Sequence, residues 1–483
     1  MLFCDMFRVV NGCVQVLRAA GLQRNSICND SAGLRIHCAD RKKAFRSQAK
    51  IPSPKAILHG SLPATVRVLN NYRYIINEAK GKQDTMKLVN QQLIKNTNLK
   101  QLYNSIYQNP GTSRAQLSKD SHLSKTAVSS LVDELIARKF VYDSGTGGST
   151  TVGRKPNSLL LRAEQYYVAV LCLEEDKLNA ALVDITGASS LPAQMEATSP
   201  ESYIPLCQAY IQETVLEQIQ KEQLLGICIV VPAMIDPDKR EIFATTLNLP
   251  EKDFVGDIQR AFSDFSVNIL NDTACFAYAE KVYTQISEKD FAFINFGKGI
   301  GATLFIRNEM LGHACASYTQ FGHYSINPKG KLCSCGNRGC LELMIGEGSL
   351  KDRIAQAGSS PAFKRSSAVT YADLGQASVY GDVVSRKVIR DIADEFSLAL
   401  CNLICMVHPK LIIIGGKGKD LGPVFLQEIQ ECLHTTGFRR MVDSVSVRYS
   451  LLDSGALYNG AMKYFFDIHY NFTQEMDGSF FIG

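Results

Sequence analysis

A cluster of cysteines carries the strongest chemical signal in this sequence. Cys333, Cys335 and Cys340 share one short segment, and His323 precedes them in the spacing H-x9-C-x-C-x4-C. Three thiolates and one imidazole suit the closed tetrahedral shell that Zn²⁺ prefers, and no fourth thiol lies nearby to take the place of the histidine. With every position filled by protein, such a zinc ion would be structural. The alternative is a set of free buried thiols, which would be an oxidation hazard.

Polar and basic residues in the first third of the chain could contact nucleic acid. Lys125, Thr126 and Ser129 lie at the start of a helical segment, the part of a helix that reads base edges in a major groove. Four further basic residues could contact phosphates or a minor groove: Arg114 and Lys119 in the preceding helix, and Arg154 and Lys155 in a Gly/Ser/Thr-rich loop. The alternative is a packing module whose polar face is only solvated.

The elements that carry these residues are short amphipathic helices. Apolar residues from Leu99 to Ile106 recur at positions i, i+3 and i+7, which predicts a first helix. Ser113 opens a second helix, with Gln116 completing a capping box, and Ser124 opens a third. The sequence therefore predicts three short helices in succession.

A hairpin follows these helices. Residues 140–142 and 158–161 have the composition of strands, and the loop between them is rich in Gly, Ser and Thr and ends on basic residues. Three helices and a hairpin with a basic tip predict a winged helix-turn-helix, which we assign to residues 86–161.

From residue 162 the pattern changes to apolar strands that alternate with helical segments around Gly-rich turns. Strands are expected at residues 167–173, 179–183, 225–231, 267–270 and 411–414. Such alternation is typical of α/β architecture, and roughly 300 residues are enough for two lobes. We assign residues 162–470 to this part and expect residues 471–483 to form a C-terminal tail.

The net charge of +5 is unevenly distributed. Residues 1–85 hold 14 Lys and Arg against 5 Asp and Glu, residues 86–157 hold 10 against 4, and the remainder is acidic. A basic front on an acidic body suggests that a polyanionic partner meets the N-terminal third. Residues 1–85 show little periodicity, so we expect a basic, weakly structured extension.

The composition excludes several classes of protein. With 46% hydrophobic and 20% charged residues, the chain can bury sizeable cores and is not a disordered or fibrous protein. No apolar run reaches the roughly 18 residues that a membrane helix needs. Fifteen cysteines at irregular spacing indicate reduced thiols. These features predict a soluble, cytoplasmic protein with no membrane partner.

An ordered series of motifs resembles one known family. The motifs are SRAQLSKDSHLSKTAVSSLVDELIARKFV, GRKP, NDTACFAYAE, GKGIGA, QFGH, CSCGNRGCLE and IIIGG. Together they resemble the ROK family (repressors, open reading frames and kinases) over about residues 86–465, and specifically its winged-helix repressor branch. The resemblance implies a winged helix-turn-helix followed by a two-lobed actin/hexokinase-like (ribonuclease H-like) domain with a structural zinc loop.

The resemblance also implies two sets of site residues. The zinc ligands would be His323, Cys333, Cys335 and Cys340. The sugar pocket would comprise Asn248, Asn271, Asp272, Gln320, His323 and Glu342. Carboxylates and amides suit this task because each makes several directional hydrogen bonds to hydroxyl groups. In family kinases the position of Asp272 is the general base, which here would be vestigial.

Two departures from the family pattern bear on activity. Family kinases carry an Asp-x-Gly-x-Thr phosphate loop at the end of their first strand, whereas this chain has Leu171-Cys172-Leu173-Glu174-Glu175-Asp176. No glycine lets the backbone approach a phosphate there, and two carboxylates would repel one. Gln320 stands where the family has a glutamate, which alters the expected sugar affinity or identity. We therefore expect no enzymatic activity.

The function implied is a sugar-responsive repressor that binds double-stranded operator DNA near carbohydrate-utilisation genes, such as those of xylose metabolism. Repressors that bind inverted repeats need two heads, so a homodimer or a dimer of dimers is expected. Two alternatives remain open. One is a sugar kinase with an appended DNA-binding head, and the other is a DNA-binding or docking factor whose pocket stays empty.

Overall fold

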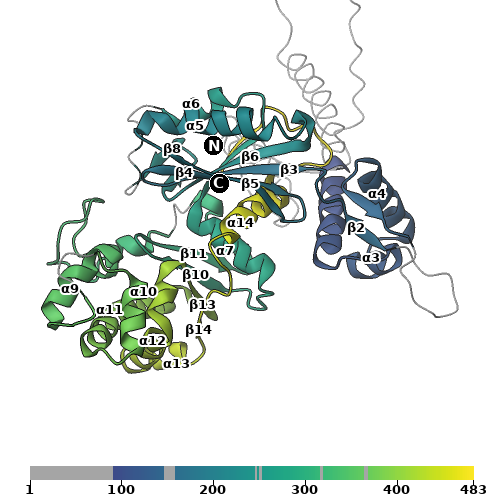
Figure 1. Cartoon of the computed structure of the whole chain (residues 1–483). Helices are drawn as coiled ribbons and strands as arrows, with labels where there is room; N and C mark the ends of the chain where they lie inside the picture. The colour runs from purple at the N-terminus through teal and green to yellow at the C-terminus, as the bar shows by residue number, and fades with distance from the viewer. Residues whose placement is uncertain are drawn as a thin grey trace, which may run out of the picture. The chain divides into compact units, whose positions relative to one another are not determined.

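The computed structural model describes residues 91–145, 158–244, 247, 249, 253–315, 319–363 and 368–483. The chain divides into two units between Thr85 and Met86, and all described residues belong to the second unit (Figure 1). The extension expected at residues 1–85 lies outside the described residues. In the part of the chain that is described, no helix is both long enough and apolar enough to cross a membrane.

The first part of this unit, which we call the head, contains helices and a small hairpin. A helix described from residue 91 ends at residue 108, and it is followed by α3 (Arg114–Ser121), α4 (Lys125–Ala137), β1 (Val141–Asp143) and β2 (Leu159–Leu161). The two strands pair antiparallel. These elements match the predicted order, with the strand starts displaced by one residue.

The predicted helix caps are present in part. The Ser113 hydroxyl oxygen accepts the Gln116 N–H at 3.2 Å, and the Ser124 hydroxyl oxygen accepts the Ala127 N–H at 3.1 Å. The Gln116 side chain does not complete the predicted capping box, because it donates to the Asp120 carboxylate at 2.7 Å. Each cap satisfies an N–H group that the helix itself leaves unpaired.

The first lobe is built on a six-stranded sheet in the order β15-β9-β6-β3-β4-β5. Its strands are β3 (Tyr167–Leu173), β4 (Lys177–Asp184), β5 (Ser189–Glu196), β6 (Leu224–Val231), β9 (Val267–Asn271) and β15 (Phe480–Ile482). β3, β4 and β5 are antiparallel, whereas β3, β6, β9 and β15 run parallel. A two-stranded hairpin, β7 (Met234–Asp236) and β8 (Glu241–Phe243), follows β6.

Helices cover both faces of this sheet. One face packs against α5 (Tyr203–Ala209) and α6 (Phe254–Ala261) in one hydrophobic core. The other face packs against α7 (Asp272–Tyr283) and α14 (Ala456–Tyr464), which lie side by side (Figure 1). Since β3 and β6 are covered on both sides, their sequences are almost continuously apolar.

The second lobe repeats this arrangement in a five-stranded sheet in the order β12-β11-β10-β13-β14. Its strands are β10 (Phe291–Phe296), β11 (Ile300–Ile306), β12 (Glu309–Met310), β13 (Leu411–Gly415) and β14 (Ser446–Tyr449). Three strands are again antiparallel and two are added in parallel. Its helices are α8 (Leu341–Ile345), α9 (Leu350–Ala357), α10 (Tyr371–Val379), α11 (Val383–Val407), α12 (Gly422–Thr436) and α13 (Arg439–Val442). Both lobes therefore share one α/β topology, as the predicted two-lobed fold requires.

An aromatic core joins the head to the first lobe. Tyr103 and Phe140 from the head pack against Phe466 and Phe472 from the end of the chain, with ring centroids 4.4 Å apart for Tyr103 and Phe466 and 5.0 Å for Phe140 and Phe472. The Arg138 guanidinium lies 5.4 Å from the centroids of Phe140 and Phe472. These side chains form one continuous core with the first lobe. The sequence patterns did not predict this contact.

The last residues, expected to form a tail, contribute to the first lobe. β15 pairs in parallel with β9, with Phe480 opposite Val267 and Ile482 opposite Ile269. His469 Nε2 lies 2.8 Å from the Gly483 carbonyl oxygen and therefore donates to it. Burial lowers the pKa of His469 to about 4, so this imidazole is neutral at physiological pH.

Deleting residues 479–483 should destabilise the protein. The deletion removes the ladder to β9 and the ring of Phe481, which stacks on His469 at 4.4 Å, so we expect a loss of about 2–4 kcal/mol and a lower Tm. Thermal unfolding of the full chain and the truncated chain measures the effect. Glu475→Ala, at a nearby exposed position, is the control and should leave Tm unchanged. Equal unfolding temperatures for the truncated and full chains would contradict the role of β15.

Candidate binding cleft and metal centre

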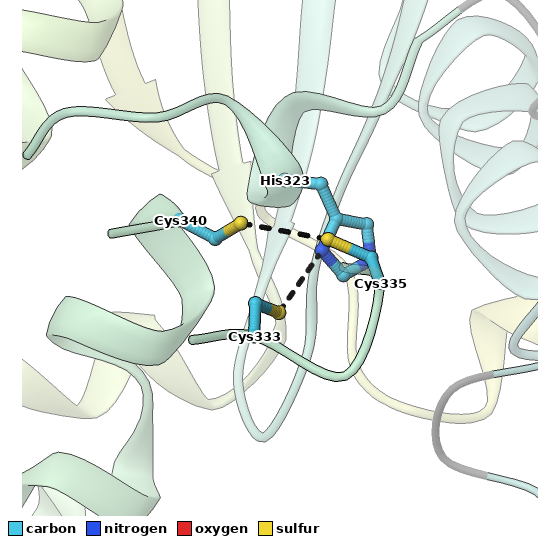
Figure 2. A group of neighbouring side chains, drawn as sticks. All are labelled: His323, Cys333, Cys335 and Cys340. Atoms are coloured by element: carbon cyan, nitrogen blue, oxygen red, sulfur yellow. Dashed lines mark hydrogen bonds between the residues drawn. The ribbon is translucent and has the colours of Figure 1, made fainter. Parts of the chain in front are cut away.

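The predicted zinc ligands converge in space. The ligand atoms of His323, Cys333, Cys335 and Cys340 all lie within 4.8 Å of one another (Figure 2). His323 Nδ1 is 3.7 Å from Cys333 Sγ, and Cys335 Sγ is 3.6 Å from Cys340 Sγ. A tetrahedral shell with Zn–S bonds of about 2.3 Å places its sulfur atoms about 3.8 Å apart. The donor set and its spacing therefore fit a tetrahedral zinc ion.

Tight backbone turns bring these ligands together. The Cys333 N–H donates to the Asn337 carbonyl at 2.7 Å, and the Gly336 N–H donates to the Cys333 carbonyl at 2.9 Å. Gly336 and Gly339 adopt positive φ values of 88° and 59°, which favour glycine. Cys340 then precedes α8 as its N-cap residue. The loop thus folds back on itself before the chain enters the second lobe's core.

The thiols of the cluster have shifted pKa values. Burial, together with the neighbouring thiols, raises the pKa of Cys340 to about 12. Burial also acts to raise the pKa of Cys333, but hydrogen bonds with Cys335 and His323 outweigh it and lower that pKa to about 7. Three thiolates in one place need a compensating positive charge, which a divalent cation supplies.

A cleft of about 1250 Å³ separates the two lobes. Its walls are the turn between β3 and β4, the end of β9 with the start of α7, the turn between β10 and β11, and part of the cysteine loop. Five of the six predicted sugar-binding residues line it: Asn271, Asp272, Gln320, His323 and Glu342. The sixth, Asn248, lies outside the described residues.

Asp272 is placed at the cleft by the junction of β9 and α7. Its Oδ1 accepts the Thr273 N–H at 2.6 Å, and its Oδ2 accepts from Asn295 Nδ2 at 3.4 Å. Burial raises the pKa of Asp272 to about 6, although hydrogen bonds from Thr273 oppose the rise. The carboxylate therefore accepts hydrogen bonds at the cleft, and its pKa is higher than that of an ordinary aspartate.

Other predicted residues hold the cleft walls in place. Asn271 is buried: its Oδ1 accepts the Ala274 N–H at 3.0 Å to cap α7, and its Nδ2 donates to the Ala233 carbonyl at 2.9 Å. Glu342 Oε2 accepts the Ile300 N–H at 2.9 Å and so fixes the turn between β10 and β11. Gln320 is exposed at the cleft.

The turn at the end of β3 is acidic, as its sequence requires. Glu174, Glu175 and Asp176 all line the cleft. The Lys298 ammonium, on the turn between β10 and β11, forms an ion pair with Glu175, and Lys177 lies 3.4 Å from Glu174. The Glu175 carboxylate therefore joins the two turns, one from each lobe, that face each other across the cleft.

Sequence reasoning missed Asn295, which lies on β10 and donates to Asp272. The available signal was a single amide in the otherwise apolar strand FAFINF, directly before the GKGIGA motif. A polar residue at the end of a buried strand often lines a site, because such sheets bind ligands at the ends of their strands.

The head presents part of the predicted DNA-binding set. Lys125 and Thr126 are exposed at the start of α4, Ser129 is half-buried on the same helix, and Lys119 is exposed on α3. Arg114 instead fastens α3 to α4, because its guanidinium pairs with Asp133 at 2.8 Å and donates to the Ser129 carbonyl at 3.1 Å. Arg154 and Lys155 lie outside the described residues.

The sequence signature of the ROK family matches residues 173–465, which is well over half of the chain. The chain belongs to the ROK family. Similar proteins include the xylose repressor of Bacillus subtilis, which is 26% identical over 375 residues, or 77% of this chain and 95% of that protein. The DNA-binding transcriptional repressor Mlc of Escherichia coli is 22% identical over 390 residues, or 76% of this chain and 95% of that protein.

Solved structures of the ROK family share the fold. A ROK family transcriptional regulator, described as a homologue of the Escherichia coli Mlc protein, superposes with a TM-score of 0.66 at 21% identity and covers 77% of this chain and 97% of that chain. A ROK family glucokinase from Streptomyces griseus superposes with a TM-score of 0.52 at 20% identity, covering 62% of this chain and 98% of that chain. Regulators and sugar kinases of the family therefore share this mixed α/β fold.

Gly339→Ala should abolish metal binding. An added Cβ would lie 1.9 Å from the Asn327 carbonyl oxygen, and a backbone atom cannot give way as the end of a flexible side chain can, so the loop must open. Gly336→Ala is a matched control, since Gly336 also has positive φ but nothing lies within 4 Å of its added Cβ. Metal analysis should find one zinc per chain in wild type and Gly336→Ala and none in Gly339→Ala. Full zinc content in Gly339→Ala would contradict the loop geometry.

Asp272→Asn should stabilise the protein at neutral pH but not at acid pH. A raised carboxyl pKa means that the folded chain favours the neutral form, so this contribution is present below about pH 3.9 and is lost as pH rises through 6. At pH 7.5 the variant should gain up to about 3 kcal/mol in the free energy of unfolding, and near pH 4 almost nothing. Urea unfolding at both pH values measures this. Asp176→Asn, at an exposed position on the same cleft, is the control for removal of a carboxylate. An equal gain at both pH values for Asp272→Asn would contradict the raised pKa of Asp272.

Proposed function

We propose that this chain is a transcriptional repressor that binds operator DNA through residues 86–161 and changes its operator affinity when a monosaccharide binds in the cleft. The observation that carries the proposal is the fusion of a head with an exposed polar helix start to a sugar-kinase-like fold. The similar proteins named as xylose repressor and Mlc repressor span nearly their whole length in the match, head included.

The head has the parts of a winged helix-turn-helix. α4 is the recognition helix, since Lys125 and Thr126 project from its exposed first turn and Ser129 lies one turn further. Side chains of this kind and position read base edges in a major groove. Lys119 on α3 contacts the phosphate backbone. Arg154 and Lys155 would extend the contact from the wing.

The cleft suits a monosaccharide. Asp272, Glu342 and His323 offer two carboxylates and an imidazole, and Gln320 and Asn295 offer amides, within one concave site. Sugar hydroxyls both donate and accept hydrogen bonds, so a mixture of such groups can fix one orientation of the ring. Because the xylose repressors are among the similar proteins, D-xylose is the first sugar to test.

A sugar kinase is disfavoured by the acidic turn at the end of β3. A nucleotide phosphate placed there would meet Glu174 and Glu175, and no glycine offers it a close backbone N–H. The sugar-binding half of the site can persist without this turn. We therefore propose that the chain binds sugar without phosphorylating it.

The metal centre has a structural role in this proposal. A zinc ion held by His323, Cys333, Cys335 and Cys340 would have no open position for substrate. It would fix the loop that carries His323 into the cleft wall and leads to Glu342 on α8. The ion thus contributes the shape of the cleft. As a repressor of inverted repeats, the protein would act as a homodimer or a dimer of dimers.

Operator titration with and without sugar tests the proposal. The purified chain selects its own site from genomic fragments, and the dissociation constant is then measured with D-xylose, D-glucose or N-acetyl-D-glucosamine present. One of these sugars should change operator affinity by about 5- to 150-fold. Asp272→Ala should bind the operator normally but lose the response, whereas Lys125→Ala with Thr126→Ala should weaken operator binding by a similar factor.

Lys351→Ala is the matched control for the head variant, because Lys351 is exposed on α9 in the second lobe, far along the chain from α4. It should leave operator affinity unchanged. If the head variant keeps wild-type affinity for the selected site, α4 does not read the operator. Formation of ADP in a coupled assay with the same sugars and ATP would favour the kinase instead.

A further inference from the structure

Helix α7 runs from the cleft to the head. It begins at Asp272, which lines the cleft, and ends at Tyr283, whose hydroxyl lies 2.7 Å from the hydroxyl of Tyr107 in the head. Its 12 residues span about 18 Å at 1.5 Å per residue. Most of them are buried, so the helix is held by packed side chains along its length. Close-packed interiors transmit displacement rather than absorb it.

The second lobe is anchored to α7 near the end of the helix, at Glu280, and at its start. The Glu280 side chain is fully buried, and its carboxylate accepts from the Ser450 hydroxyl and lies 3.4 Å from the Arg448 guanidinium on β14. At the start of α7, Asn295 of β10 donates to Asp272. A movement of the second lobe therefore acts on α7 at both of these positions.

The first lobe is anchored to α7 through α14. An added Cβ on Gly460 would lie 1.9 Å from the Cys275 carbonyl oxygen and 3.2 Å from the Ala279 side chain. The backbones of the two helices are therefore in direct contact. Because no side chain separates them, α7 cannot shift without moving α14.

The head is fixed to these two helices by polar contacts. Tyr278 on α7 donates to Asp467 Oδ2 at 2.8 Å, and the Lys100 ammonium in the head donates to the Asp467 carbonyl oxygen at 2.7 Å. With the hydroxyl pair of Tyr107 and Tyr283, these contacts place the first helix of the head across the end of α7.

Lys463 places a buried positive charge where the head meets α14. Its side chain on α14 is only 3% exposed, it forms an ion pair with Asp467, and its ammonium donates to Asn104 Oδ1 at 2.7 Å. The same ammonium lies 4.9 Å from the centroid of the Tyr107 ring. A buried charge tolerates few arrangements of its partners, because each lost partner costs its desolvation. The head therefore packs against α7 and α14 in one defined position.

We propose that α7 is the strut that couples the cleft to the head, and that Tyr283 is the positioning residue at its head end. The effector acts on α7 at Asp272, the second lobe acts on it at Glu280, and the hydroxyl pair passes its position to Tyr107. This assignment rests on the proposed function for its effector. To that function it adds the path by which a change at the cleft reaches the head, and it names the residues along this path.

Tyr283→Phe removes one hydroxyl and keeps the ring. Operator titration with the full chain, with and without D-xylose, D-glucose or N-acetyl-D-glucosamine, should show wild-type operator affinity without sugar and wild-type sugar affinity without DNA. The sugar-induced change in operator affinity should fall several-fold towards unity. Tyr107→Phe should do the same. Tyr449→Phe is the matched control, since it also removes a buried hydroxyl hydrogen bond, to the Gly422 carbonyl at 2.7 Å in the second lobe.

A measurement without sugar separates this proposal from the function itself. Hydrogen exchange in residues 99–107 is compared between wild type, Asp272→Asn, Tyr283→Phe and the double variant. A strut predicts that Asp272→Asn changes exchange in residues 99–107 beyond the uniform slowing that its higher free energy of unfolding causes, and that Tyr283→Phe abolishes this additional change. Exchange altered only around residues 271–276, or a full sugar response in Tyr283→Phe, would overturn it. A wild-type chain that shows the exchange coupling but no sugar response would overturn the proposed function and leave the strut standing.

Discussion

The contact between the head and the first lobe is the constraint on which the remaining geometry depends. Rings from Tyr103 and Phe140 are buried against Phe466 and Phe472, in a core continuous with that of the first lobe. Domains joined by a small polar interface move independently, whereas a large apolar interface makes them one body. The head therefore follows the first lobe and α7 in any motion. A change at the cleft can reach the exposed start of α4 only through this shared body.

The cleft draws its chemistry from the ends of strands and from one loop. Asp272 follows β9, Asn295 is the next-to-last residue of β10, and the acidic turn follows β3. Since the two sheets share one strand order over five strands each, their corresponding turns, between β3 and β4 and between β10 and β11, both line the cleft. His323 belongs both to the cysteine cluster and to the cleft wall. The folding of the cysteine loop therefore also determines the shape of the cleft.

Local patterns predicted the local parts of this structure. The caps at Ser113 and Ser124, the strand at residues 167–173 and the cysteine cluster depend on neighbouring residues, so periodicity and spacing reveal them. Contacts between distant segments leave no such trace. The burial of Lys463 and the pairing of β15 with β9 follow from tertiary packing. Neither a single lysine nor a short C-terminal segment carries a sequence pattern that predicts such packing. The engagement of Arg114 with Asp133 likewise depends on how two helices meet.

The aromatic core between the head and the first lobe combines residues that lie far apart along the chain, and this has a consequence for biosynthesis. Arg138 and its partner Phe472 are separated by 334 positions, and both lobes apart from β15 are made between them. At about 5–20 residues per second, a ribosome needs roughly 20 to 70 s to supply the second half of this core after the first. During that interval the nascent head exposes an aromatic surface that its own chain cannot yet cover. Slow translation, or a shortage of chaperones that shield such surfaces, should therefore lower the yield of folded protein.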